Sequence, residues 1–257
     1  MWTHALSYPV AEERGVKAAA EALGYRVDVI KPWTLGGGKG DISRMLWSRG
    51  IRGVLLAPNY SRPDPRYDLD WPRFCTVLLG SSLVNQGLTR VSRDYYHDAT
   101  LALDQLRKHG CQRPGIVLES NFYERSGRRC VAAFLAFGGS RKHTHVFKVR
   151  DDLNRDAVLR WYEQTKPDGV VVAAPPIAGW LSHAPMLALL NQPCETAGTG
   201  VQVNFEQIGM EGMHALNALL RTDRRGLLPN PTSILVPGRW VENGCIIPTS
   251  ASVLSHK

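Results

Sequence analysis

Hydrophobic residues along this chain form short runs, and longer stretches of mixed polar and apolar residues separate them. Val, Ile and Leu dominate the runs, which is typical of strands buried on both faces of a sheet. The predicted strands cover residues 25–30, 53–58, 75–80, 88–92, 113–120, 144–149 and 168–174. Helical spacing is clearest late in the chain, at Ile208, Met213, Leu216 and Leu220. The alternation predicts an α/β fold with parallel sheets covered by helices.

The predicted strands fall into two groups, which indicates two similar Rossmann-like lobes. We expect a first lobe over 1–112, a shortened second lobe over 113–203, and a terminal helix and extended crossover segment over 204–257. Ligands of such folds bind beyond the carboxyl ends of the strands. The expected ligand position is therefore the cleft between the lobes.

Composition is that of an ordinary globular protein, with 44% hydrophobic and 21% charged residues among 257. The longest apolar stretch, 169–181, is short and is interrupted by Pro175 and Pro176. The first residues lack the pattern of a secretory signal. Five scattered cysteines without a Cys-x-x-Cys pair predict free, mostly buried thiols in a reducing compartment. These features predict a cytoplasmic protein that contacts no membrane.

The chain carries a formal net charge of +8, which permits contact with nucleic acid but does not establish it. The densest basic clusters are Arg128–Arg129 and Arg221 with Arg224–Arg225. No basic stripe interleaved with aromatic residues is present. We interpret most of this charge as a solvated surface.

A glycine run at 35–40 contains Lys39 but does not fit a phosphate-binding loop, because Gly40 stands where a Ser or Thr is required. No Gly-x-Gly-x-x-Gly opens a helix directly after a strand. We expect a simple loop that ends at Asp41, a good helix N-cap.

Other catalytic or metal-binding patterns are incomplete. No Gly-x-Ser-x-Gly elbow occurs. His143 and His145 are spaced to share one face of a strand but lack a nearby third ligand. Cys130 has no His or Asn placed by the sequence to activate it. We therefore predict a binding protein that is not an enzyme, with no cofactor and no metal.

Ordered motifs over nearly the whole chain resemble one family. The most extensive covers 91–120, with Val-x-x-Asp, an Ala- and Leu-rich helix, Leu-x-x-x-Gly, then Arg and an apolar strand. Four further segments match in order; they are "RGIRGVLLAP", "RRCVAAFLAF", "KPDGVVVAA" and "VQVNFEQIGMEGMHALNALL" with "LVPGRWVENG". Together they resemble the effector-binding core of LacI/GalR transcriptional regulators, which has a periplasmic binding protein-like type I fold.

The resemblance implies a ligand-sensing and dimerisation core. Its effector would be a carbohydrate, and ligand-dependent lobe closure would alter the geometry of a homodimer and hence its affinity for operator DNA. DNA would be contacted only through a helix-turn-helix, which this chain does not contain. A stand-alone solute-binding protein is one alternative, and a small α/β enzyme using His97 or Asp98 is another.

The resemblance also implies effector-binding residues. Asp94 matches an acidic residue that contacts effector in relatives, although a helix N-cap explains it equally well. Asn59 and Ser81 follow strands of the first lobe, and Arg128 or Arg129 would supply a guanidinium for sugar hydroxyls or a carboxylate. The usual position of that arginine in the family is Cys130 here.

Three departures from the family pattern stand out. Ala174 and Pro175 replace a usual Asn-Asp pair, and residues 193–198 are too short and polar for the strand expected there. Both bring the usual sugar effector into question. The opening strand of the first lobe is also absent, which would leave the edges of its neighbours at 25–30 and 52–57 unpaired. We therefore hypothesise that Met1 is not the biological start, or that the gene is decayed or trimmed.

Overall fold

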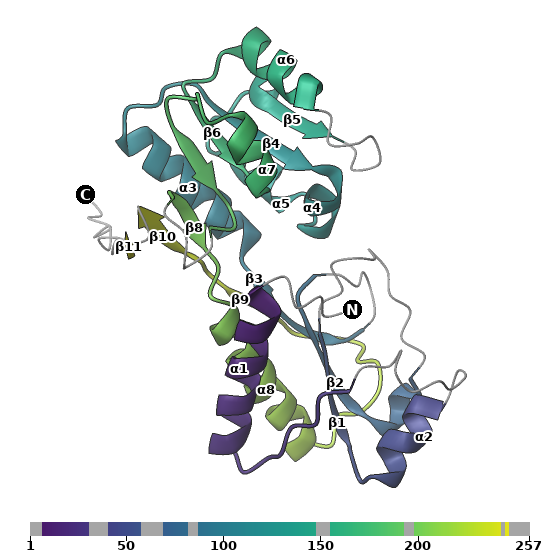
Figure 1. Ribbon diagram of the computed structural model, residues 1–257. Helices are drawn as coiled ribbons and strands as arrows, with labels where there is room; N and C mark the ends of the chain where they lie inside the picture. Colours follow the sequence, from purple (N-terminus) through teal and green to yellow (C-terminus); the bar gives the residue numbers. More distant parts are fainter. Residues whose placement is uncertain are drawn as a thin grey trace, which may run out of the picture. The chain divides into compact units, whose positions relative to one another are not determined.

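The chain folds into two compact α/β units (Figure 1). The computed structural model describes residues 7–30, 41–57, 69–81, 87–147, 155–192, 198–242 and 245–246. Unit 1 comprises Met1–Arg93 and Asn204–Val236, and unit 2 comprises Asp94–Val203 and Pro237–Lys257. The chain therefore passes from one unit to the other three times. Asn59 and the predicted loop at 35–40 lie outside the described residues.

Unit 1 is built on a sheet of four parallel strands in the order β1-β2-β3-β9. The strands are β1 (Gly53–Leu56), β2 (Cys75–Leu79), β3 (Thr89–Arg93) and β9 (Ser233–Val236). Arg90 of β3 is in register with Ser233 of β9, so a segment near the end of the sequence completes the first sheet.

Helices cover both faces of this sheet because alternate side chains of each strand point to opposite faces. Leu56 and Leu78 join the core that also contains Leu46 of α2 (Asp41–Ser48). On the other face, α8 (Phe205–Arg221) approaches closely, since a Cβ on Gly212 would lie 2.3 Å from Leu79 Cδ2. A side chain at position 212 would force Leu79 to move.

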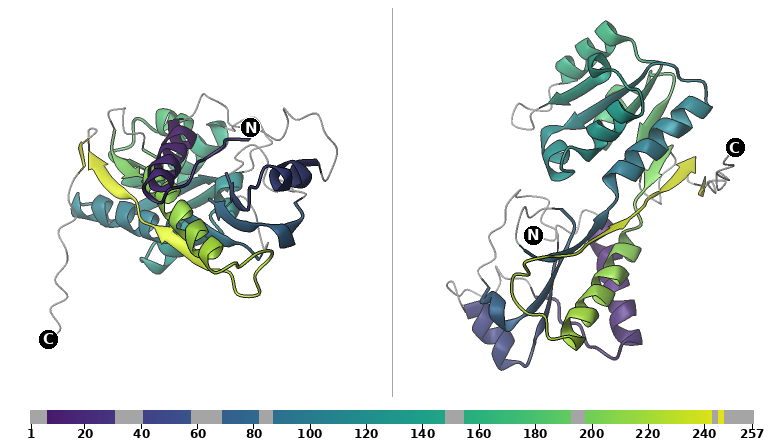
Figure 2. Two further views of the ribbon diagram at one scale, coloured as in Figure 1. Left: turned by 90° about the horizontal axis from the view of Figure 1, so that it is seen from below. Right: turned by 180° about the vertical axis from the view of Figure 1, so that it is seen from behind.

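The helix α1 (Ser7–Ala22) packs against α8 with backbone touching backbone (Figure 2). A Cβ on Gly15 would lie 1.9 Å from the carbonyl oxygen of Glu206, and one on Gly209 would lie 2.1 Å from that of Glu12. Glycine is thus required on each helix. The contact buries the Glu12 side chain, and its Oε2 has no hydrogen-bond partner among the residues that the structure describes.

Unit 2 contains a seven-stranded sheet in the order β11-β10-β8-β7-β6-β4-β5. Its strands are β4 (Pro114–Glu119), β5 (Thr144–Phe147), β6 (Gly169–Val172), β7 (Leu187–Leu189), β8 (Gly200–Gln202), β10 (Arg239–Glu242) and β11 (Cys245–Ile246). β10 runs antiparallel to β8, and β11 runs antiparallel to β10; the other pairs are parallel.

Two separate cores lie on the faces of this sheet. Ile116 and Leu118 belong to the core with α3 (Tyr95–Lys108) and α5 (Arg129–Ala136). Val117 between them belongs to the core with α6 (Arg155–Thr165) and α7 (Pro175–Trp180). A short helix, α4 (Ser120–Arg125), follows β4, and three-residue 3-10 helices, η2 (Trp71–Arg73) and η3 (Arg141–His143), complete the described elements. No described helix is long and apolar enough to cross a membrane.

The predicted fold class is confirmed, with parallel sheets in two α/β units. The predicted strand over 25–30 is wrong, because this segment pairs with no strand in the structure. Among the described residues, β1 bonds only to β2 and forms the edge of the sheet. Tyr25 and Val29 are instead exposed. Alternating apolar residues form a strand only when a neighbouring strand is present to accept and donate the backbone hydrogen bonds.

The second unit contains a strand to which the sequence analysis assigned no element. Leu187–Leu189 forms β7 and pairs with β6 from Val170↔Leu187 onward. Residues 193–197, where relatives would carry a further strand, lie outside the described residues. The error arose because three apolar residues in a row carry no period that separates strand from helix.

The compact units also differ from the ranges 1–112, 113–203 and 204–257 expected from sequence. The helix α3 lies in unit 2, because its apolar face packs on β4 and β6. The terminal segment is divided between the units, with α8 and β9 in unit 1 and β10 in unit 2.

Asp98 joins α3 to the start of β10 within unit 2. Its side chain is completely buried, and Oδ1 accepts a hydrogen bond of 2.8 Å from the backbone N–H of Gly238. A Cβ on Gly238 would lie 2.5 Å from Val201 Cγ1 and 2.8 Å from that carboxylate oxygen. A larger residue at position 238 would therefore disturb the hydrogen bond between the backbone N–H of this position and Asp98.

Replacing Asp98 by Ala should lower the free energy of unfolding by about 1.5–3 kcal/mol, because a buried N–H loses a charged acceptor. Asp104→Ala on the same helix is the matched control, since Asp104 forms only a surface ion pair with Lys108. Its effect should stay below about 1 kcal/mol. Urea unfolding measures both. Equal losses in the two variants would contradict this role of Asp98.

Burial raises the pKa of Glu12 to about 8. The folded protein thus holds this proton more tightly than the unfolded chain, where the pKa is near 4.5. The stability contributed by the protonated form is fully present below pH 4.5 and is lost as the pH rises to about 8. Within that window the free energy of unfolding should fall by up to about 1.4 kcal/mol per pH unit.

The variant Glu12→Gln should remove this part of the pH dependence and raise stability at pH 8. Glu13→Gln is the control, because Glu13 lies beside Glu12 but forms a surface ion pair with Lys17. Urea unfolding across the pH window measures both variants. A Glu12→Gln profile parallel to that of the unmodified protein would contradict the assignment.

Candidate functional site

The carboxyl ends of β2 and β3 place two of the sequence-predicted residues at one edge of the unit 1 sheet. Leu79 pairs with Val91, and the two parallel strands end at Leu79 and Arg93. Ser81 follows the first strand after Gly80 and is half-buried, and Asp94 directly follows the second. The structure therefore brings Ser81 and Asp94 to the same edge, as the sequence predicts for adjacent parallel strands.

Asp94 is the N-cap of α3. Its Oδ1 accepts hydrogen bonds from the backbone N–H groups of Tyr96 (3.1 Å) and His97 (3.0 Å). These bonds satisfy two donors that a helix start leaves unpaired. The capping interpretation is confirmed, and any contact of Asp94 with effector stays a prediction.

Arg128 and Arg129 are both exposed at the start of α5. Arg128 has a left-handed backbone, with φ of 63°, and its guanidinium lies 3.5 Å from Glu124 and 5.7 Å from the ring centre of Tyr123. Exposed ion pairs of this kind contribute little stability. The side chain thus has local partners, and its role in gripping a ligand stays a prediction.

Two residues that the sequence analysis did not select lie at the carboxyl end of β4. Glu119 is the last residue of the strand, and Arg125 is the last residue of α4. Burial raises the pKa of Glu119, and the nearby positive charge of Arg125 lowers it in part. The guanidinium carbon of Arg125 also lies 5.8 Å from the ring centre of buried Phe122.

Glu119 and Arg125 are both half-buried, and the charge of Arg125 acts on the Glu119 carboxyl, which ends a strand at the edge where α/β folds bind ligands. An acidic residue that closes an apolar strand was the available sequence signal. The arginine had no such signal, because its position depends on the short helix α4. The end of β6, by contrast, continues into Ala174 and Pro175 and offers no charged side chain.

Asp98 and Cys130, two of the residues considered for catalysis, are buried. Asp98 is buried and accepts the N–H of Gly238, whereas His97 is exposed. Cys130 is completely buried, with its thiol 3.5 Å from the carbonyl oxygen of Tyr95. Cys75, Cys111 and Cys130 are free and buried, as predicted. Burial raises the thiol pKa of Cys75 and of Cys111. Within the described ranges, no group of three His, Cys, Asp or Glu side chains could hold a metal ion.

Comparison with solved structures shows that this fold is the one found in LacI-family transcriptional regulators. A protein described as a LacI-family regulator from Rhizobium etli aligns over 94% of this chain and 95% of its own, with a TM-score of 0.69 and 19% identity. The regulator CelR in complex with cellobiose aligns over 94% and 80%, with a TM-score of 0.62 and 15% identity. A LacI-family regulator from Enterococcus faecium with bound ribose aligns over 93% of both chains, with a TM-score of 0.60 and 10% identity.

No protein-family model matches the sequence, and no curated protein is significantly similar to it. The similarity is therefore one of fold, at low sequence identity. The class defined by the comparison is thus a fold class, the two-unit α/β fold that LacI-family regulators have.

The left-handed backbone of Arg128 leads to a stability prediction. Arg128→Asn should leave the free energy of unfolding unchanged or raise it by up to about 1 kcal/mol, because Asn tolerates this conformation better. Arg129→Asn at the adjacent helical position should bring no gain. Thermal unfolding compares the two. A clear loss in Arg128→Asn would show that its side-chain contacts contribute more than expected for an exposed residue.

Proposed function

We propose that this chain is the ligand-sensing and dimerisation core of a LacI-type transcriptional regulator whose effector is a carbohydrate. The fold match over more than nine-tenths of the chain carries the proposal. Two of the similar proteins contain cellobiose and ribose, which supports a sugar as the effector class. In the intact regulator, a homodimer would bind DNA through a helix-turn-helix domain.

Glu119 and Arg125 are the groups in unit 2 that suit a sugar. A carboxylate accepts hydrogen bonds and a guanidinium donates them, so the pair matches hydroxyl groups, which do both. Partial burial strengthens such bonds, because water competes less. Phe122 beside the guanidinium adds an apolar surface for the carbon face of a sugar ring.

Ser81 of unit 1 and Asp94, the first residue of unit 2, are further candidates, together with Asn59 from the sequence. The Ser81 hydroxyl can donate and accept, and the second carboxylate oxygen of Asp94 is not used in capping. Arg128 and Arg129 are less suitable, because exposed side chains give weak hydrogen bonds to a ligand.

The mechanism follows from binding energy. An effector can shift an equilibrium between conformations only by the difference in its affinity for them. We propose that effector binding stabilises one arrangement of the two units, that the arrangement changes the dimer, and that the dimer sets the affinity for operator DNA. The chain passes between the units three times, so three covalent connections would transmit a change in one unit to the other.

Thermal unfolding with a panel of monosaccharides, disaccharides and sugar phosphates tests the proposal. A ligand that binds only the folded state raises the midpoint with increasing concentration. Arg125→Gln should weaken binding of the active sugar about 10- to 100-fold, because a charged hydrogen bond is lost. Arg125→Lys should recover part of the affinity.

Arg129→Gln is the matched control and should bind as the unmodified protein does. The midpoint without sugar reports whether each variant folds. The absence of any shift across the panel would contradict a carbohydrate effector. If the sugar still raised the unfolding midpoint of Arg125→Gln, a carbohydrate effector would remain supported, but Arg125 would not be part of its binding site.

A further inference from the structure

Six arginines that are scattered in the sequence gather at one end of unit 1. We call this surface the arginine face; its members are Arg49, Arg52, Arg73, Arg221, Arg224 and Arg225. They come from the ends of α2 and α8 and from the segments that enter β1 and β2. Since those strands are parallel, the face lies at their amino ends, opposite the edge with Ser81 and Asp94.

Trp47 of α2 brings two of these arginines together. The guanidinium carbon of Arg52 lies 3.5 Å from the centre of the Trp47 ring, and that of Arg73 lies 5.4 Å away. Cation–π contacts of this kind hold the flexible side chains in place. Arg52 also donates to the carbonyl oxygens of Trp47 and Ile51, both at 3.1 Å.

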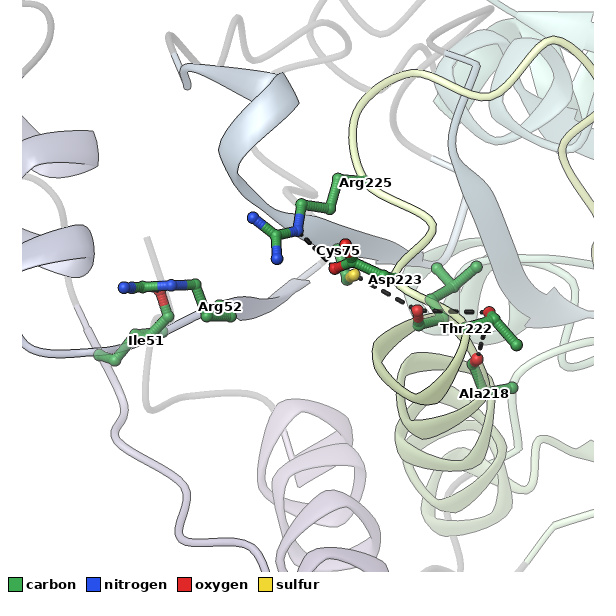
Figure 3. A network of polar contacts seen from close by, with 8 residues as sticks. Ile51, Arg52, Cys75, Ala218, Thr222, Asp223 and Arg225 are labelled. Atoms are coloured by element: carbon green, nitrogen blue, oxygen red, sulfur yellow. Dashed lines mark hydrogen bonds and ion pairs between the residues drawn. The ribbon is translucent and has the colours of Figure 1, made fainter.

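The turn after α8 brings the other arginines to the same place. Gly226 donates to the carbonyl oxygen of Phe74, which directly follows Arg73, and the Cys75 thiol lies 3.5 Å from the carbonyl oxygen of Leu219. The charges of Asp223 and Arg225 both act on that thiol. Figure 3 shows the side chains of Arg225 and Arg52 extending on the same side of Cys75.

Positive charge predominates on the arginine face. Two acidic residues in the described part of this surface each pair with an arginine of the face, Asp70 with Arg73 at 2.6 Å and Asp223 with Arg225 at 2.6 Å. At the neighbouring end of α1, Arg26 and Asp28 pair with each other, 3.5 Å apart, and Glu21 is exposed.

Arg49, Arg221 and Arg224 are exposed, and the described part of the chain shows no acceptor for their guanidinium groups. Interaction with the negative helix ends explains part of the cluster, but that effect is confined to the last turn. Arg52 already bonds to the end of α2. The remaining arginines are available to an anionic partner.

We propose that the arginine face binds the phosphate backbone of duplex DNA without reading its sequence. Every cation in the set is arginine, whose planar fork matches phosphate oxygens. The Trp47 ring is covered by the guanidinium groups of Arg52 and Arg73, so this ring is not open for stacking unpaired bases. A duplex fits this surface better than a single strand, which relies on such stacking.

This inference goes beyond the proposed function, because the sequence analysis expects DNA contact only through a helix-turn-helix outside this chain. The proposed DNA binding requires neither a sugar effector nor residues of unit 2. Contacts to phosphate neutralise charge and release counterions, so they make affinity depend steeply on salt.

Fluorescence anisotropy of the purified chain with a labelled duplex of about 20 base pairs and arbitrary sequence, between about 25 and 200 mM NaCl, tests the proposal. The triple variant Arg49→Gln, Arg221→Gln, Arg224→Gln should lower the slope of log affinity against log salt by about 2–3. The single variant Arg224→Gln should lower it by about 1. At the lowest salt, the triple variant should bind at least about tenfold more weakly.

The control carries the same charge change in unit 2, with Arg113→Gln, Arg141→Gln and Lys142→Gln at exposed positions. It should bind the duplex as the unmodified protein does, and thermal unfolding confirms that all variants fold. Equal losses in both triple variants would overturn the proposal, as would absence of binding at the lowest salt. Tighter binding of single-stranded RNA, or equal displacement by polyglutamate, would show a different partner. No sugar is present, so the result is independent of the effector.

Discussion

The close contact of α1 with α8 is the constraint on which unit 1 depends. Gly15 and Gly209 let the two helices meet backbone to backbone, and any side chain at either position would separate them. At that distance α8 lies flat on the sheet, with Gly212 against Leu79. The same contact removes the Glu12 carboxyl from water and raises its pKa. A packing requirement thus creates an electrostatic cost that the rest of the unit must offset.

The helix α8 also explains why neither unit is continuous in sequence. It returns the chain to unit 1, where β9 pairs with β3, and the chain then leaves again to form β10 in unit 2. The passage from β9 of unit 1 to β10 of unit 2 needs a glycine at position 238, whose N–H donates to the buried carboxylate of Asp98. Each unit therefore depends on segments far apart in the chain. A ligand that alters one unit acts on a structure tied by three crossings.

The two ends of the unit 1 strands have different chemistry. At the carboxyl ends lie small polar groups such as Ser81 and Asp94, which suit a neutral, hydroxyl-rich ligand. At the amino ends lies the arginine face, where the helix ends attract cations and Trp47 orders them. In unit 2, Glu119 ends a strand at the carboxyl edge, and the charge of Arg125 acts on its carboxyl. The proposed sugar-binding residues and the proposed DNA-binding face therefore use opposite ends of parallel strands.

The sequence alone predicted the α/β class, most strands and the long helix α8, because buried parallel strands and amphipathic helices have strong local periods. It could not settle segments whose state depends on a partner. Residues 25–30 alternate like a strand but pair with none, and Leu187–Leu189 is too short to show a period yet completes a sheet. Charge placement was beyond its reach as well: adjacent Arg128 and Arg129 stood out in the sequence, whereas α4 brings Arg125 to Glu119. Neighbouring residues determine the local preference for helix or strand. Strand pairing and the placement of charged side chains depend on contacts between residues far apart in the sequence, which only the tertiary structure decides.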